Sequence, residues 1–164
     1  MKFVICVAAV LLSSVTGRTW HAKRETDPGP ALTCYSGTCE NVVAPVRRIL
    51  QGPTFRYLIR EGLDCSQQTL TIAGECQTSS ADCRVRHQNP DLPSALITFC
   101  RYKTEIEDEA SCWTSDNLPW ALLSCADEDR SAFAECAEKR VSSLTECSET
   151  SGAIFREMLS GLLP

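Results

Sequence analysis

Histidine and paired carboxylates are the first groups that could carry chemistry in this chain. The sequence holds two histidines, and a hydrolase with a histidine base would have to use His87, because His21 lies in a charged stretch with proline and glycine. No G-x-S-x-G nucleophile elbow occurs, and no His-Asp pair is followed by paired cysteines as in secreted phospholipases. The 21 acidic residues leave paired carboxylates for glycoside hydrolysis open. We therefore expect no enzyme, with an unrecognised secreted hydrolase as an alternative.

Metal binding is a second kind of chemistry that the spacing disfavours. Zinc sites use close pairs such as C-x2-C with nearby histidines, whereas the closest cysteines here are Cys34 and Cys39. The acidic runs Glu105–Glu109 and Asp127–Asp129 lack the alternating oxygen ligands and the turn glycine of an EF-hand loop. Such runs are typical of solvated helix faces or of helix starts. The sequence predicts neither a metal nor a cofactor.

Cysteine is the residue type whose number and spacing are most informative. Eleven cysteines occur, and Cys6 lies in an apolar N-terminal run. The other ten form an even set, which in an oxidising compartment predicts five intramolecular disulfides. About 945 pairings are available to ten cysteines, and the sequence does not choose among them. The candidates are Cys34, Cys39, Cys65, Cys76, Cys83, Cys100, Cys112, Cys125, Cys136 and Cys147.

Recurrence of cysteine every seven or eleven residues indicates helices. At about 100° per residue, eleven steps end about 20° past three full turns, so cysteines at this spacing share a helix face. Two sets follow the rule, Cys65, Cys76 and Cys83, and then Cys125, Cys136 and Cys147. Apolar residues accompany the second set at helical spacing, namely Phe133, Ala137, Val141 and Leu144. The segment therefore predicts one long amphipathic helix over residues 125–147.

The N-terminus predicts export from the cell. Residues 1–17 combine the basic Lys2, an apolar run from Phe3 to Leu12 and small residues before Gly17, which is the pattern of a signal peptide cleaved after Gly17. The apolar run falls well short of the roughly 20 residues that span a bilayer. We expect a secreted, extracellular protein with no transmembrane segment in the mature chain.

Two further regions follow the signal peptide. Residues 18–33 mix charges with proline and glycine, so we expect a flexible lead-in or a propeptide. The dibasic pair Lys23-Arg24 is either a propeptide cleavage site or part of an ordinary charged tail. Residues 34–164 are expected to form a single cysteine-rich helical domain.

Helix signals continue through this domain. An apolar face with Pro45 in its first turn is expected before Gly52, formed by Val42, Val43, Val46, Ile49 and Leu50. Thr54 can cap a short helix that ends at Gly62, and residues 66–76 are expected to be helical, although TLTIA could be a strand. The segment Arg84–Asp91 is a polar loop in this interpretation.

Two similar stretches open further helices, DLPSALITFC at 91–100 and NLPWALLSC at 117–125. We expect the first helix to continue to about Cys112 and the second to lead into the 125–147 segment. The predicted fold class is all-α, a small secreted helical bundle stapled by disulfides.

The C-terminal segment Ala153–Leu163, which follows Gly152, predicts an amphipathic helix without a cysteine. Burial of its apolar face would yield of order 10 kcal/mol, and ordering about eleven residues costs a comparable amount. We expect this helix to dock on the core and to be exchangeable for a partner or for a second copy in a homodimer. Its candidate contact residues are Ile154, Phe155, Met158 and Leu159.

Charge and composition favour recognition as the function. Residues 34–103 carry 8 basic and 6 acidic side chains, whereas residues 104–164 carry 4 basic and 13 acidic side chains. The resulting negative net charge disfavours nucleic-acid binding. The leading candidate surface is a basic cluster of Arg84, Arg86 and His87. We expect binding to an extracellular protein receptor or another secreted protein, as a hormone-like factor or as a toxin or effector. The alternative is a structural protein of the extracellular matrix.

The stretch FRYLIREGLDC at 55–65 resembles one stretch of the stanniocalcins, a family of helical, cysteine-rich hormones. The resemblance covers eleven residues, and the surrounding cysteine spacing differs from that of the family. No fold, partner or site residue is inferred from it.

Overall fold

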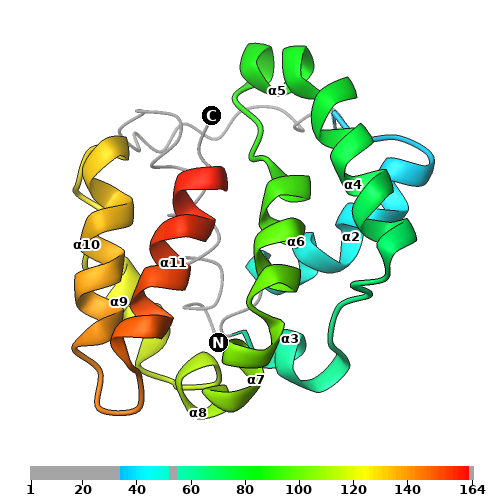
Figure 1. Cartoon of the computed structure of the whole chain (residues 1–164). Coiled ribbons are helices and arrows are strands. Elements are labelled where there is room, and N and C mark those ends of the chain that lie inside the picture. The colour runs from blue at the N-terminus through cyan, green and yellow to red at the C-terminus, as the bar shows by residue number, and fades with distance from the viewer. Residues whose placement is uncertain (1–33, 52–54, 163–164) are drawn as a thin grey trace, which may run out of the picture.

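The computed structural model describes residues 34–51 and 55–162, and the regular structure of this part is entirely α-helical (Figure 1). The all-α fold stapled by disulfides is therefore confirmed. Several predictions concern residues outside the described ranges and stay predictions. They are the signal peptide at 1–17 with cleavage after Gly17, the lead-in at 18–33 with Lys23 and Arg24, and the cap at Thr54.

The helices fall into two groups along the chain. The N-terminal half, defined here as residues 34–101, holds α2 (Thr38–Gln51), α3 (Arg56–Glu61), α4 (Gln67–Ser79), α5 (Ala81–His87) and α6 (Leu92–Arg101). The C-terminal half, defined as residues 103–162, holds α7 (Lys103–Asp108), α8 (Ala110–Trp113), α9 (Leu118–Leu123), α10 (Arg130–Ser142) and α11 (Glu149–Leu162).

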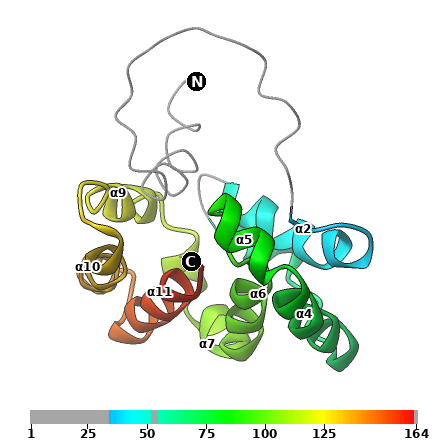
Figure 2. The same cartoon turned by 90° about the horizontal axis from the view of Figure 1, so that it is seen from above.

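Most of the longer helices lie next to one another across the molecule (Figures 1 and 2). Helix α11 packs between α10 and α6, and α4 packs on the other side of α6. The short helices α3, α7 and α8 close the lower end in Figure 1, whereas α5 lies at the upper end. The C-terminal helix is thus a central element of the fold, because it joins the two halves.

Four aromatic side chains form the centre of the core. Phe55 and Phe99 come from the N-terminal half, and Trp113 and Phe155 come from the C-terminal half. Trp113 and Phe155 stack at 4.4 Å between ring centroids, and Phe55 meets both rings edge-on at 5.5 and 5.2 Å. Such pairs add to the hydrophobic gain of burial. One core therefore unites the two halves.

Gly152 lies inside α11, so its expected role as a break before the helix is wrong. A Cβ atom at this position would lie 2.0 Å from Ser142 Oγ and 2.8 Å from the carbonyl oxygen of Glu138, both on α10. Only glycine allows α10 and α11 to approach this closely. The helix begins at Glu149 instead, and the hydroxyl of Ser148 accepts hydrogen bonds from the backbone N–H of Thr150 and Ser151.

The predicted continuous helix over residues 125–147 is also wrong. The carboxylate of Asp129 accepts a hydrogen bond of 2.9 Å from the backbone N–H of Ala132 and begins α10 there. Cys125 lies in the turns before α10, and its Cα atom is 5.8 Å from that of Cys136. Eleven residues of helix would separate these atoms by about 16 Å. The eleven-residue spacing therefore reflects a chain reversal here and not a shared helix face.

Two other helix predictions need correction. The helix expected from Asp91 to about Cys112 is divided into α6, α7 and α8, with breaks at Tyr102 and Glu109, and the chain turns there to close the end of the bundle. Pro45 is the eighth residue of α2 and does not lie in the first turn. The missing N–H of proline costs one backbone hydrogen bond, while Val43 and Val46 on either side of it are fully buried.

Three predicted helix ends are confirmed. Ser66 accepts a hydrogen bond from the backbone N–H of Thr69 at the start of α4, which excludes the strand alternative for TLTIA. Asp91 caps α6 in the same way through the N–H of Ser94 at 3.0 Å. Gly62 ends α3 with a φ of 69°, a conformation that glycine adopts without strain.

All ten candidate cysteines are paired, which confirms five intramolecular disulfides. The pairs of the N-terminal half are Cys34–Cys83, Cys39–Cys76 and Cys65–Cys100. The pairs of the C-terminal half are Cys112–Cys147 and Cys125–Cys136. None of these five bonds crosses from one half to the other. The halves are therefore held together by packing and polar contacts.

Candidate partner-binding surface

Helix α5 carries the basic residues that the sequence singled out, and its inner face is fixed to the core. Cys83 is bonded to Cys34, and the guanidinium of Arg84 is buried. Arg84 forms an ion pair with Asp91 at 2.5 Å and donates hydrogen bonds to Ser80 Oγ at 3.0 Å and to the carbonyl oxygen of Gln77 at 2.9 Å. Arg84 is therefore a structural residue, and its predicted place on the partner surface is wrong.

A second set of contacts fixes the chain just beyond α5. The hydroxyl of Tyr35 donates to the carbonyl oxygen of Pro90 at 2.8 Å and accepts from the N–H of Leu92 at 3.2 Å. Burial raises the pKa of Tyr35. The backbone N–H of Asp91 donates to the carbonyl oxygen of Leu162 at 3.2 Å. These contacts tie the turn between α5 and α6 to Tyr35 and to the end of α11.

The last three residues of α5 are exposed. Val85 is 71% exposed, and Arg86 and His87 beside it are also exposed. We call these three residues the α5 knob. The predicted polar loop at 84–91 is thus partly wrong, because residues 84–87 form the last turn of α5 and the chain leaves the helix at Gln88, with a φ of 53°.

Val85 was missed from the sequence because one valine between two arginines looks like part of a polar loop. Cys83, two positions earlier, carried the missing signal. Once Cys83 is placed on the inner face of a helix, the residue two positions later lies about 200° around the axis and must point outward.

The second predicted surface, on the C-terminal helix, is buried. Ile154, Phe155, Met158 and Leu159 are each at most 2% exposed. The expected docking of this helix on the core is seen. Its apolar face is covered by α10, by α6 and by the aromatic core. These residues are therefore not accessible to a partner.

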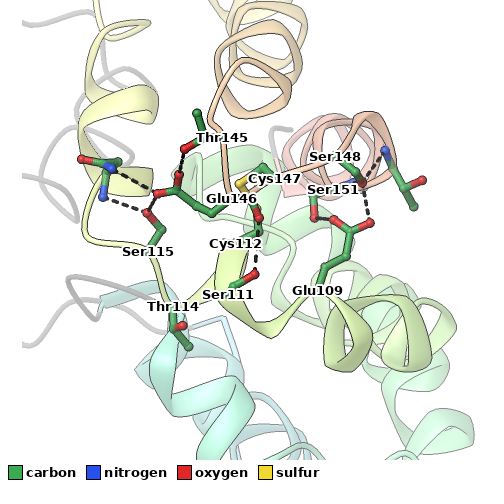
Figure 3. Close-up of a disulfide and its surroundings, with 12 residues drawn as sticks. Glu109, Ser111, Cys112, Thr114, Ser115, Thr145, Glu146, Cys147, Ser148 and Ser151 are labelled. Atoms are coloured by element: carbon green, nitrogen blue, oxygen red, sulfur yellow. Dashed lines mark hydrogen bonds between the residues drawn. A yellow bond between two sulfur atoms is a disulfide. The ribbon is translucent and has the colours of Figure 1, made fainter.

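Carboxylates and hydroxyl groups surround the Cys112–Cys147 disulfide in a separate cluster (Figure 3). Ser148 and Ser151 donate hydrogen bonds to the two carboxylate oxygens of Glu109. Glu146 accepts from Ser115 and Thr145 and from the side-chain amide of Asn117. Glu109 thereby holds the start of α11 against α8. We interpret the cluster as structural, because its hydroxyl groups donate to carboxylates and tie neighbouring elements together.

This cluster predicts an acid-sensitive contribution to stability. The hydroxyl of Ser115, together with Thr145 and Asn117, lowers the pKa of Glu146 from 4.5 to about 2. Because the pKa is lower in the folded chain, ionised Glu146 stabilises the fold above about pH 4.5, and this stabilisation is lost as the pH falls towards 2. We expect the Glu146→Gln variant to lose less unfolding free energy than the wild type over this interval. Urea unfolding at successive pH values measures the unfolding free energies of the two proteins. Equal slopes of unfolding free energy against pH would contradict the prediction.

Residues 34–51 and 55–162 contain no group of three or more His, Cys, Asp or Glu side chains placed to hold a metal ion. In the same part of the chain, no helix combines the length and the hydrophobicity that a membrane span requires.

The fold and the disulfides define the class of molecule, a small all-α domain stapled by five disulfides within two halves. Comparison of the chain with protein-family models, with curated proteins and with solved structures finds no match in any of the three. Functional inference therefore depends on the surface of the chain itself.

Proposed function

We propose that the protein is a secreted binding protein, hormone-like or toxin-like in its action, that engages another extracellular protein through the α5 knob. The observation that carries this proposal is the 71% exposure of Val85 on a helix whose opposite face is fixed. Trp120, at 60%, is the other large apolar side chain exposed to this degree in the described residues. Five disulfides support an oxidising, extracellular setting.

Rigidity of the α5 knob supports a role in recognition. The Cys34–Cys83 disulfide and the buried pair of Arg84 with Asp91 hold α5 in one position before any partner arrives. A preorganised surface loses less conformational entropy on binding than a flexible one. Cys83 and Arg84 lie about 200° and 100° around the helix axis from Val85, so neither anchoring side chain shares the face of Val85.

The chemistry of the knob indicates the chemistry of its partner. Val85 requires an apolar hollow, because an aliphatic side chain gains free energy only when it leaves water. Arg86 beside it favours carboxylates at the rim of that hollow. We therefore propose a protein partner with an apolar hollow and an acidic rim.

Binding assays with the full chain test this function. The double variant Val85→Asp/Arg86→Glu is expected to bind at least tenfold more weakly than the wild type, since loss of a central anchor costs about 2 kcal/mol or more. The measurement is saturable binding of the fluorescently labelled protein to tissue sections of the source organism, competed by unlabelled wild type. Non-reducing mass spectrometry checks that both proteins carry five disulfides.

Trp120→Ser is the matched control, because it removes the other exposed apolar side chain. It is expected to bind like the wild type. Absence of saturable binding by the wild type would contradict the proposed function. Loss of binding with Trp120→Ser and not with the α5 variant would place the site on α9 and contradict the assignment to α5.

A further inference from the structure

The disulfide that fixes α5 is more accessible than most of the bonds in the described residues. Cys34 and Cys83 are both half-buried, and so are Cys65 and Cys100. Each of the other three bonds contains a cysteine that is at most 1% exposed, namely Cys76, Cys112 or Cys125. A thiol from solution must reach a sulfur atom in order to attack it. Exposure therefore leaves two candidate bonds for cleavage by an external thiol.

A hydrogen-bond donor distinguishes the Cys34–Cys83 bond. The side-chain amide of Asn89 donates to Cys34 Sγ at 3.1 Å. Such a donor stabilises a thiolate more than a bonded sulfur, because the acceptor then carries a charge. Thiol–disulfide exchange expels one sulfur as a thiolate and is faster when that thiolate is more stable. Cys34 is therefore the sulfur that leaves, and Cys83 is the sulfur that is attacked.

The charges near this bond are balanced. Arg86 follows Cys83 by three residues on α5, which makes their side chains neighbours on the helix surface. The exposed Asp82 is adjacent to Cys83 as well, and the cation of Arg86 offsets its carboxylate. Arg84 and Asp91 neutralise each other in their buried pair. An approaching thiolate is therefore not repelled.

The Cys65–Cys100 bond has less favourable surroundings. Cys65 follows the exposed Asp64 in the chain. Arg101, which follows Cys100, is paired with Glu157, so its charge is already balanced. An attacking or a leaving thiolate at this bond therefore meets the negative charge of Asp64. Of the two accessible bonds, the one that holds α5 is the easier to open.

We propose that the Cys34–Cys83 bond is a redox switch for the α5 knob, opened by an extracellular thiol reductant before the other four disulfides. A thiolate of the reductant attacks Cys83 Sγ and forms a mixed disulfide, while the bond to Cys34 breaks and Cys34 leaves as a thiolate. A second thiolate of the reductant then attacks its own sulfur in the mixed disulfide and releases Cys83. The reductant becomes a disulfide, and the protein gains two electrons and two protons.

Opening of this bond loosens α5 and leaves the core in place. The hydrophobic core takes its side chains from elements other than α5. The ion pair of Arg84 with Asp91 still holds the end of the helix, so α5 is loosened and not lost. A loosened knob has to be ordered again when it binds, which costs conformational entropy. The reduced protein is therefore the weaker binder, an inference that rests on the proposed function because it concerns the same α5 knob.

Thiol mapping of the full chain tests the order of reduction. The oxidised wild type is treated with dithiothreitol, free thiols are alkylated at intervals, and peptide mass spectrometry locates the labels. Cys34 and Cys83 are expected to be labelled about tenfold faster than any other pair. Asn89→Leu and Arg86→Gln are each expected to slow this reaction about threefold. Arg60→Gln is the matched control, because it alters an exposed arginine on α3, and it is expected to leave the rate unchanged.

Hydrogen exchange of the protein reduced and alkylated only at Cys34 and Cys83 tests the release of α5. The backbone N–H of Arg84 donates to the carbonyl oxygen of Ser80 at 2.9 Å in the closed form. This amide is expected to exchange about tenfold faster after reduction, whereas amides of α6 and α11 keep their rates. Saturable tissue binding of the reduced form is expected to be about three- to tenfold weaker. The Cys34→Ser/Cys83→Ser variant gives the open state without alkyl groups.

Several results would overturn the inference. They are earlier reduction of Cys65–Cys100, concerted reduction of all five bonds, unchanged exchange in α5, and equal tissue binding of the oxidised and reduced forms. If the bond opens first and α5 is released, but even the oxidised protein shows no saturable binding, the proposed function is wrong and the redox site stands. If tissue binding depends on Val85 and the bond is not opened first, the proposed function stands and the inference is wrong.

Discussion

Truncation after Gly152 is expected to abolish folding of the protein. It removes five buried side chains, Ile154, Phe155, Met158, Leu159 and Leu162. At about 1.5–3 kcal/mol each, their burial contributes of order 10 kcal/mol, which is comparable with the whole stability of a small domain at roughly 5–15 kcal/mol. The loss of Phe155 also leaves Trp113 without its stacking partner at 4.4 Å.

Secretion yield and the number of free thiols measure this outcome. We expect the truncated chain to be retained in the cell or to be secreted with mispaired cysteines, because α10 and α6 would expose their apolar faces. Truncation after Leu162 is the control, since it keeps all of these buried side chains. A secreted truncated chain with five native disulfides would show that α11 is dispensable for the core.

Replacement of Arg84 by methionine is expected to destabilise the fold by about 3–5 kcal/mol. The ion pair of Arg84 with Asp91 has side chains only 9% and 10% exposed, so removal of the cation leaves a buried carboxylate without its counter-charge. Gln77 and Ser80 lose their hydrogen bonds with Arg84 at the same time. Chemical denaturation at neutral pH measures the change.

Two controls separate the buried charge from the loss of packing. Arg86→Met alters an exposed arginine two residues away and is expected to change stability by no more than about 0.5 kcal/mol. The double variant Arg84→Met/Asp91→Asn removes the buried charge and keeps a side-chain acceptor for the cap of α6, so it should recover part of the loss. Equal effects of Arg84→Met and Arg86→Met would contradict the structural role of Arg84.

The sequence predicted the fold class well because its signals are local. Helical apolar spacing and helix-start signals such as the cap at Asp91 act over a few residues, and the structure confirms them. The pairing of cysteines depends on which helices meet in space. The spacing of Cys125, Cys136 and Cys147 therefore suggested a common helix face, although the last of these pairs with Cys112.

The candidate site was predicted only in part, because it too depends on contacts between helices. Exposure of Arg86 and His87 follows from their polarity, but the burial of Arg84 depends on a carboxylate beyond the following turn. Gly152 likewise resembled a break before the last helix, because the sequence does not show that Ser142 and Glu138 pack against it. Contacts between elements are not encoded in any short stretch of sequence.

The segregation of the disulfides between the halves has a consequence for biosynthesis. If the chain is exported into an oxidising compartment, as proposed, oxidation can begin during its entry, because the three bonds of the N-terminal half need no residue beyond Cys100. That half can close all its bonds before Cys112 arrives, and no early bond has to be reopened to admit a late cysteine. Until Trp113 and Phe155 follow, however, Phe55 and Phe99 lack half of their core. A newly made chain can therefore be fully cross-linked over its first half while the aromatic side chains of that half are still uncovered.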